Sequence, residues 1–286
     1  MTHEEHTAYS YLRQTKKFPN VWCSGCGIGV VMGALIRAID RIGLLKDDVA
    51  VVSGIGCTGR MPVYLDFNTM HTTHGRALAF ATGLKLAQPR LKVIVVMGDG
   101  DALAIGGNHF IHAARRNIDL TAIIVNNSIY GMTGGQYSPT TPLDQLATTA
   151  PYGNIEPPFQ VGDLAMAAGA SYVARSTVYH AVELDRYIEQ AIRKSGFSLV
   201  EAVSYCHTTF GRINKLGTAV DMMRKLKENS VTKSAAEKLS PQECANKIVR
   251  GVLCDLDKPE YTALYDQVIE RAKMGENGKQ RTAGGL

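Results

Sequence analysis

The sequence predicts an α/β protein with a mostly parallel sheet, helices covering both faces of that sheet, and a helical C-terminal extension. Apolar runs of strand length alternate with segments of helix length between residues 49 and 203. This alternation is typical of parallel sheets, because a helical crossover returns the chain to the same end of the sheet. Several runs end in clusters of small and polar residues, which is where ligands bind in such folds.

The expected strands comprise residues 49–52, 91–97, 120–125, 171–173 and 197–203. The expected helices comprise residues 75–87, 102–116, 163–168 and 178–194. The segment from Gly131 to Pro158 breaks the alternation and is rich in Gly, Thr and Pro. A loop of that length inside a compact domain is usually functional.

Beyond Cys206 the chain becomes polar and helical in character. Pro241 is placed to begin a helix, which we expect to run to Cys254. We therefore divide the chain into an α/β domain of residues 1–208, which includes an N-terminal arm, and a helical extension with a tail, residues 209–286.

Composition and charge exclude several classes of protein. The hydrophobic content of 45% and the charged content of 20% are ordinary for a globular protein with a sizeable core. No apolar run approaches the roughly 20 residues of a membrane span, and the polar start lacks the features of a secretory signal. We therefore expect a cytoplasmic protein without membrane contact. The net charge of +5 is modest, and no motif or aromatic-interleaved basic stripe indicates nucleic-acid binding.

The most informative pattern is Gly98-Asp99-Gly100-Asp101 after one apolar run and Asn126-Asn127 after the next. A βαβ unit places the C-terminal ends of both strands side by side. We therefore expect Asp99 and Asn127 to meet as hard oxygen ligands of a Mg²⁺ ion that holds a diphosphate. The glycines allow the backbone to approach that diphosphate without a Cβ clash.

Asp101, the last residue of the glycine-rich turn, has two interpretations. It could support the shell around the Mg²⁺ ion, or it could cap the helix expected to begin at Ala102. We favour capping, with some contribution to the ion's surroundings.

Four of the six cysteines are expected to converge. Cys23 and Cys26 precede an apolar helix, Cys57 follows the first strand, and Cys206 follows the last. Cys57 and Cys206 would share the carboxyl edge of a parallel sheet, and an N-terminal arm would bring the other two there. Four thiolates could hold an iron–sulfur cluster or a structural Zn²⁺, and the spacing does not separate these metals. A redox-active dithiol at Cys23 and Cys26 and simple burial of the others are the competing interpretations.

Taken together, these motifs resemble the β subunits of 2-oxoacid:ferredoxin oxidoreductases. The matching segments are Trp22-Cys23-Ser24-Gly25-Cys26-Gly27, Gly56-Cys57, His74-Gly75-Arg76, Gly98-Asp99-Gly100-Asp101, residues 126–136, and Cys206. The Gly-Asp-Gly and Asn-Asn pair resembles the thiamine-diphosphate signature. The resemblance implies a thiamine-diphosphate-binding fold, with that cofactor at the interface with an α subunit and one 4Fe–4S cluster in this subunit.

The resemblance also implies roles for individual residues. Mg²⁺ would be held by Asp99, the side chain of Asn127 and the carbonyl of Ile129. The cluster ligands would be Cys23, Cys26, Cys57 and Cys206. The residues implied at the thiamine diphosphate are Gly56, Cys57, His74, Gly98, Asp99, Gly100, Asp101, Asn127, Ile129, Gly131, Met132 and Thr133. The glutamate that activates the cofactor would belong to the α subunit, so this chain alone is expected to be inactive.

The implied activity is oxidative decarboxylation of a 2-oxo acid with coenzyme A, or its reverse, with electrons passed through the cluster to ferredoxin. The implied assembly is αβ or (αβ)₂. Met132 stands where pyruvate-type relatives tend to carry Asn, and Arg60 is suited to pair with a distal carboxylate. These two residues favour 2-oxoglutarate, and together with His74 they are the expected substrate and cofactor pocket.

Three alternatives stay open at this point. Pyruvate could replace 2-oxoglutarate as the substrate. The chain could be half of a non-oxidative thiamine-diphosphate decarboxylase that carries a structural zinc. It could also be an electron-transfer module without thiamine chemistry, in which Asp99 and Asn127 would lie far apart.

Overall fold

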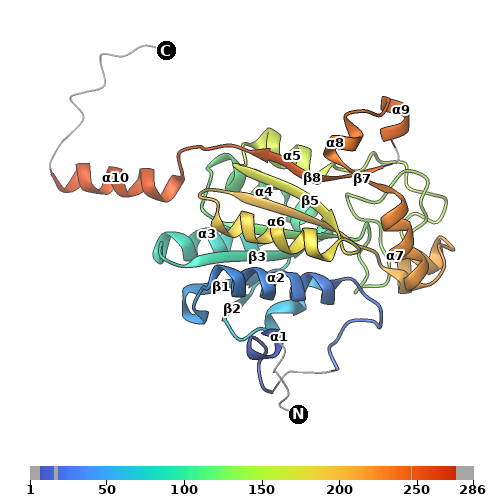
Figure 1. Cartoon of the computed structure of the whole chain (residues 1–286), viewed down its shortest axis with the longest axis horizontal. Coiled ribbons are helices and arrows are strands. Elements are labelled where there is room, and N and C mark those ends of the chain that lie inside the picture. The colour runs from blue at the N-terminus through green and yellow to red at the C-terminus, as the bar shows by residue number, and fades with distance from the viewer. Residues whose placement is uncertain (1–6, 16–18, 246, 275–286) are drawn as a thin grey trace.

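The computed structural model describes residues 7–15, 19–245 and 247–274. Within them, eight strands form one sheet in the order β2-β1-β3-β4-β6-β5-β8-β7. Figure 1 shows the sheet with helices packed around it. The strands are β1 Val49–Ser53, β2 Asn68–His71, β3 Lys92–Gly98, β4 Thr121–Asn126, β5 Tyr172–Thr177, β6 Ser198–Val203, β7 Ser230–Thr232 and β8 Ile248–Asp255. All neighbouring pairs run parallel except β5 and β8. The predicted fold class is confirmed.

Helices cover both faces of the sheet, as expected. The helices are α1 Thr7–Ser10, α2 Ile28–Ile42, α3 Ala77–Ala87, α4 Gly107–Arg115, α5 Val161–Ala168, α6 Ala181–Arg193, α7 Ala219–Glu228, α8 Lys233–Ala236, α9 Pro241–Cys244 and α10 Tyr261–Lys273. Helices α2 and α6 pack on one face, against residues such as Val51 and Val96, and α3, α4 and α5 pack on the other, against Val52 and Val95. Successive residues of a strand therefore pack into two separate hydrophobic cores, because their side chains point alternately to the two faces of the sheet.

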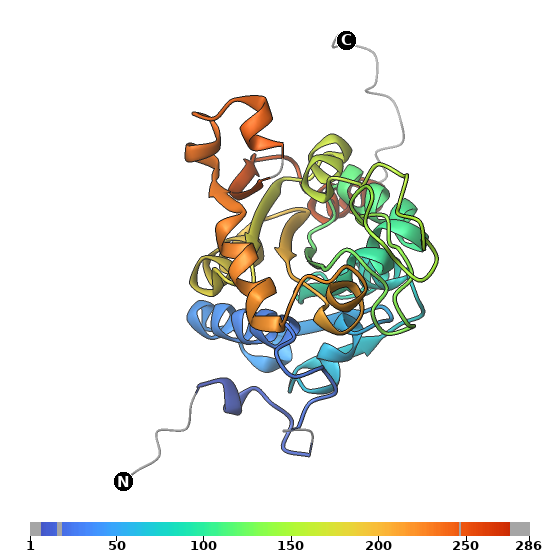
Figure 2. The same ribbon diagram turned by 90° about the vertical axis from the view of Figure 1, so that its right-hand side faces the viewer.

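The carboxyl ends of the parallel strands point toward one end of the molecule. The loop of residues 131–158 and helix α7 lie at that end, which faces the viewer in Figure 2. None of the described helices is long and apolar enough to cross a membrane.

Two predicted helices differ from the structure. The helix expected at 102–116 opens instead with a π-helical turn, Asp101–Ile105, before α4 begins at Gly107. The helix expected from Pro241 to Cys254 is wrong, since α9 ends at Cys244.

Strand β8 follows α9 along the chain, and its branched apolar residues favour a strand over a helix. Its backbone pairs antiparallel with the open edge of β5. Strand β8 thus adds part of the C-terminal extension to the main sheet. The division of the chain at residue 208 stays a prediction.

Candidate cofactor and metal site

A cavity of about 210 Å³ lies at the carboxyl ends of β1, β3 and β4. Every residue expected to contact the cofactor lines it: Gly56, Cys57, His74, Gly98, Asp99, Gly100, Asp101, Asn127, Ile129, Gly131, Met132 and Thr133. Three residues that the sequence motifs did not single out complete the wall, namely Ile55, Thr58 and Tyr130. The strand ends therefore bring the dispersed motifs to one place, as the βαβ pattern predicts.

The polar groups of Asp99, Asn127 and Ile129 converge inside this cavity. One end of the Asn127 amide lies 2.8 Å from the carbonyl oxygen of Ile129 and 3.3 Å from Oδ1 of Asp99. With the amide oxygen on that side, three oxygens face one another, and only a cation stabilises such an arrangement. With the amide nitrogen there, Asn127 donates to both oxygens and needs no ion.

These separations fit a magnesium ion. Adjacent ligands of an octahedral Mg²⁺ with bonds of 2.0–2.1 Å stand about 2.9 Å apart. A bound ion would therefore select the amide orientation that presents oxygen. The donor set consists of one carboxylate, one side-chain amide and one main-chain carbonyl, all of them hard oxygen ligands.

Two hydroxyl groups fix the carboxylate of Asp99, which is only 2% exposed. Oδ2 of Asp99 accepts hydrogen bonds from Ser138 Oγ at 2.5 Å and from Thr140 Oγ1 at 2.6 Å, which leaves Oδ1 for the cation. Burial raises the pKa of Asp99, and these hydroxyls oppose that shift. Ser138 and Thr140 come from the loop of residues 131–158, so this loop supports the carboxylate of the candidate metal site. The sequence predicted that this loop is functional but did not single out Ser138 or Thr140.

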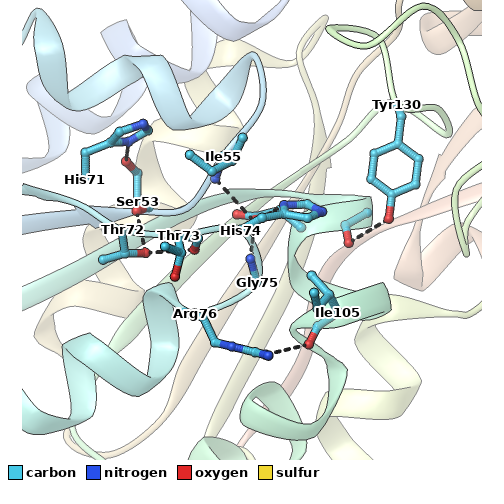
Figure 3. A network of polar contacts seen from close by, with 12 residues as sticks. Ser53, Ile55, His71, Thr72, Thr73, His74, Gly75, Arg76, Ile105 and Tyr130 are labelled. Atoms are coloured by element: carbon cyan, nitrogen blue, oxygen red, sulfur yellow. Dashed lines mark hydrogen bonds and ion pairs between the residues drawn. The ribbon is translucent and has the colours of Figure 1, made fainter.

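Asp101 connects three loops around the cavity. Its Oδ1 accepts the main-chain N–H of Gly75 at 2.7 Å and that of Ile55 at 3.3 Å, and Nδ1 of His74 lies 2.7 Å away. Figure 3 labels these three partners, Gly75, Ile55 and His74. Burial raises the pKa of Asp101, and the bond from Gly75 is the strongest opposing influence. The prediction that Asp101 caps a helix is wrong, because no side chain caps that turn. Its carboxylate turns toward Gly54, where a Cβ atom would lie 2.0 Å from Oδ2.

Tyr130 forms the wall beside Gly100. Its hydroxyl donates to the carbonyl of Gly100 at 3.1 Å, and a Cβ on Gly100 would lie 2.3 Å from the tyrosine ring. Burial raises the pKa of Tyr130 to about 12, so the phenol stays protonated and remains a donor at neutral pH. The ring also meets His74 edge-on, with centroids 6.0 Å apart. The second glycine of the motif is thus required by the tyrosine as well as by a diphosphate.

Of the three residues expected in the substrate and cofactor pocket, two line the cavity and one does not. His74 and Met132 line the cavity, and Met132 is 47% exposed. Arg60 is exposed on the short 3-10 helix Thr58–Val63 and is not among the lining residues. A role for Arg60 toward substrate therefore stays a prediction.

The four cysteines predicted to converge lie close enough to influence one another. All are free thiols. Burial above all, and then the charges of nearby Cys57, Cys206 and Cys23, raise the pKa of Cys26 to about 11. The pKa of Cys57 is raised by the same kinds of cause. Each thiolate makes it harder for its neighbours to lose their protons. A bound metal group would remove this penalty, because its positive charge stabilises the thiolates.

Two aromatic side chains hold the N-terminal arm at this position. Trp22 donates from Nε1 to the carbonyl of Cys57 at 2.8 Å, and the hydroxyl of Tyr205 donates to the carbonyl of Gly25 at 2.8 Å. The thiols also adjoin the cofactor cavity. Cys57 lines the cavity, and a Cβ on Gly131 would lie 3.2 Å from Sγ of Cys206.

This combination of fold and site is that of a thiamine-dependent enzyme. A family model described as the C-terminal TPP binding domain of thiamine pyrophosphate enzymes matches residues 54–202. That match covers the strands and loops that build the cavity.

Relatives narrow the class to one family. The 2-oxoglutarate synthase subunit KorB of Methanocaldococcus jannaschii is 50% identical over 268 residues, which cover 94% of this chain and 99% of that protein. The 2-oxoacid:ferredoxin oxidoreductase subunit beta of Saccharolobus solfataricus is 38% identical over 247 residues, 86% of this chain and 80% of that one. The chain belongs to the family of 2-oxoacid:ferredoxin oxidoreductase β subunits that includes KorB.

A solved structure supports the same family. It is the 2-oxoglutarate:ferredoxin oxidoreductase from Magnetococcus marinus with 2-oxoglutarate, coenzyme A and succinyl-CoA bound. It matches with a TM-score of 0.83 and 33% identity, over 95% of this chain and 92% of the other. The resemblance drawn from the motifs is confirmed.

Proposed function

We propose that the protein is the β subunit of a 2-oxoglutarate:ferredoxin oxidoreductase. It would convert 2-oxoglutarate and coenzyme A to succinyl-CoA and CO₂, or run the reverse reaction, with ferredoxin as the electron partner. The observation that carries this proposal is the convergence of Asp99, Asn127 and the Ile129 carbonyl at the carboxyl edge of the sheet. The names of KorB relatives and the ligands of the Magnetococcus marinus enzyme favour 2-oxoglutarate over pyruvate.

The cavity residues would bind and orient the cofactor. Bound thiamine diphosphate would supply the electron sink that decarboxylation of a 2-oxo acid needs. Asp99, Asn127 and the Ile129 carbonyl would hold Mg²⁺, and Gly98 and Gly100 would let the diphosphate approach the backbone. His74, fixed by Asp101, would face the diphosphate from the opposite loop.

The cysteines Cys23, Cys26, Cys57 and Cys206 would hold a 4Fe–4S cluster. Tetrahedral zinc needs four ligands gathered around one ion, at about 2.3 Å for thiolates. Within the part of the chain that the structure describes, no three His, Cys, Asp or Glu side chains are gathered so tightly. The names of the KorB relatives and of the Magnetococcus marinus enzyme favour the oxidoreductase over a decarboxylase half with zinc.

The remaining parts of the machinery would come from outside this chain. An α subunit would supply the glutamate that activates the cofactor and would complete an αβ or (αβ)₂ assembly. The compartment would be the cytoplasm, a reducing place where cysteines serve as metal ligands or stay as thiols. Arg60 would pair with the distal carboxylate of 2-oxoglutarate, which pyruvate lacks.

Replacing Asp99 by Ala tests the metal site. Asp99→Ala removes the only carboxylate among the three proposed Mg²⁺ ligands, so we expect affinity for thiamine diphosphate with Mg²⁺ to fall by at least about 100-fold, the loss of about 3 kcal/mol of charge-assisted binding. Isothermal titration of the αβ complex with cofactor and Mg²⁺ measures this affinity. The iron and sulfide content should stay unchanged, because Asp99 does not contact the thiols.

Asp163→Ala is the matched control, because Asp163 is exposed on α5 and lies outside the cavity. It should bind the cofactor as the unchanged protein does. Unchanged affinity in Asp99→Ala would remove the basis for the proposed metal site.

A further inference from the structure

Two threonine hydroxyls contact the thiols of the cysteine set. Oγ1 of Thr209 lies 2.8 Å from Sγ of Cys206. Oγ1 of Thr208 lies 3.6 Å from Sγ of Cys206 and 3.7 Å from Sγ of Cys23. One hydroxyl therefore bridges thiols that come from the two ends of the α/β domain, and a second hydroxyl makes a closer contact to one of them.

The local backbone fixes both hydroxyls on the side of Cys206. The threonines lie in a π-helical turn, His207–Gly211, that follows β6 directly after Cys206. The turn is closed by the main-chain N–H of Gly211, which donates to the carbonyl of Cys206 at 2.8 Å. Loop residue Gly135 packs against Thr209, since a Cβ there would lie 3.4 Å from the threonine Cβ.

The direction of these hydrogen bonds follows from the chemistry of a loaded site. A metal-bound cysteine is a thiolate, which accepts hydrogen bonds but has no proton to donate. The threonine hydroxyls must then be the donors. A hydrogen bond to a ligand sulfur offsets the negative charge that reduction adds, so it stabilises the reduced cluster more than the oxidised one.

We propose that Thr208 and Thr209 are positioning residues that donate hydrogen bonds to the thiolates of Cys206 and Cys23 and raise the reduction potential of the cluster. The inference rests on the proposed function, because it needs the cluster to be present. It goes further, because it assigns to this turn the control of how readily the cluster accepts an electron. Cys206 also lies beside the cavity wall, since a Cβ added at Gly131 would come within 3.2 Å of its sulfur.

Thr209→Val tests the inference, since valine keeps the shape of threonine and removes only the hydroxyl. The αβ complex is purified anaerobically, and the cluster is titrated with a redox mediator while its visible and EPR spectra are recorded. At the midpoint of the unchanged enzyme, the ratio of reduced to oxidised cluster should fall about ten-fold, which is about 59 mV for a one-electron couple. Thr209→Ser retains the hydroxyl and should restore most of the ratio.

Thr82→Val is the matched control. The hydroxyl of Thr82 donates to the carbonyl of Leu78 at 2.7 Å within α3, so its removal should leave the midpoint unchanged. An unchanged midpoint in Thr209→Val with full iron and sulfide overturns the inference alone. If Thr209→Val loses the cluster, Thr208→Val decides: a lower midpoint supports the inference and an unchanged one overturns it. Absence of iron and sulfide in the unchanged complex overturns the cluster assignment, and the inference with it.

Discussion

At the scale of single residues, Asp99 and Asp101 differ in how much of their environment could be predicted. Asp99 follows β3 and Asn127 follows its parallel neighbour β4, so the sheet itself dictates that the two meet. The partners of Asp101 lie in loops around Ile55 and Gly75, far from it in the chain. The sequence around Asp101 favoured a helix cap, because a local pattern includes only the residues that are adjacent in the chain.

Tyr130 and Ser138 show a similar limit. Both lie in or beside the long loop that was expected to be functional, and both contact the glycine-rich turn. Their roles depend on how that loop folds back over β3, which no spacing rule specifies. The twelve residues that the family resemblance implied all line one cavity, and their contact with the cofactor stays a prediction. The roles of Tyr130 and Ser138 became visible only in the structure.

A prediction at the residue scale concerns substrate choice. Arg60→Met should lower kcat/KM for 2-oxoglutarate by roughly 10- to 100-fold, because a charge-assisted hydrogen bond contributes about 1.5–3 kcal/mol. Activity with pyruvate should change little, since pyruvate has no distal carboxylate. Steady-state kinetics of the αβ complex with both substrates measure the difference.

Arg90→Met is the control for Arg60→Met, because Arg90 is an exposed arginine between α3 and β3 and lies outside the cavity. An equal loss of activity with both substrates would assign Arg60 a structural role instead of substrate recognition.

At the scale of elements, both π-helical turns follow strand ends at the site. The turn Asp101–Ile105 follows β3, and the turn His207–Gly211 follows β6. Such turns are rare and are often found at functional sites. Their hydrophobic pattern matches that of an ordinary helix, so sequence periodicity predicted one continuous helix from residue 102. The π-helical turn Asp101–Ile105 is recognised only in the folded structure, where Gly75 packs against Gly106 at its end.

A prediction at the element scale compares two lysine–carboxylate pairs of equal length. Lys85 and Asp119 are 2.6 Å apart and largely buried, whereas Lys46 and Asp66 are 2.6 Å apart and exposed. Lys85→Met should lower the free energy of unfolding by about 3 kcal/mol, because it leaves Asp119 without its cation in a poorly hydrated place. Lys46→Met should cost less than about 1 kcal/mol.

Urea unfolding of both variants measures these free energies. Lys85 also donates to the carbonyl of Leu91 at 2.9 Å, so it ties the end of α3 to the residue before β3. A loss in Lys85→Met no larger than that in Lys46→Met would show that the buried pair does not stabilise this connection.

At the scale of the whole molecule, the cofactor cavity and the four cysteines share one edge of the sheet. Cys57 lines the cofactor cavity, and a Cβ added at Gly131 would lie 3.2 Å from the sulfur of Cys206. The cavity itself remains open beside exposed side chains such as Met132 and Ile55. We therefore expect the chain to be incomplete as a catalyst until a second subunit covers that face.

Reconstitution tests this expectation. The isolated chain, loaded with thiamine diphosphate and Mg²⁺, should show no ferredoxin reduction with 2-oxoglutarate and coenzyme A above background. Adding the α subunit should restore turnover, and replacing its activating glutamate by glutamine should cost about 10²- to 10⁴-fold in kcat, as loss of a general acid–base group does. Turnover by the isolated chain would show that all catalytic groups lie within it.

The two outer strands of the sheet carry a consequence for solubility. Strands β2 and β7 have four and three residues, and neither is buried on both faces. Arg13 donates to Thr69 Oγ1 at 2.6 Å, so a charged side chain also lies against the β2 edge. Short, polar edges of this kind resist pairing with strands of other chains, which is how natural sheets avoid aggregation. We therefore expect that the sheets of two copies of this chain do not pair through their edge strands, even when no other subunit is bound.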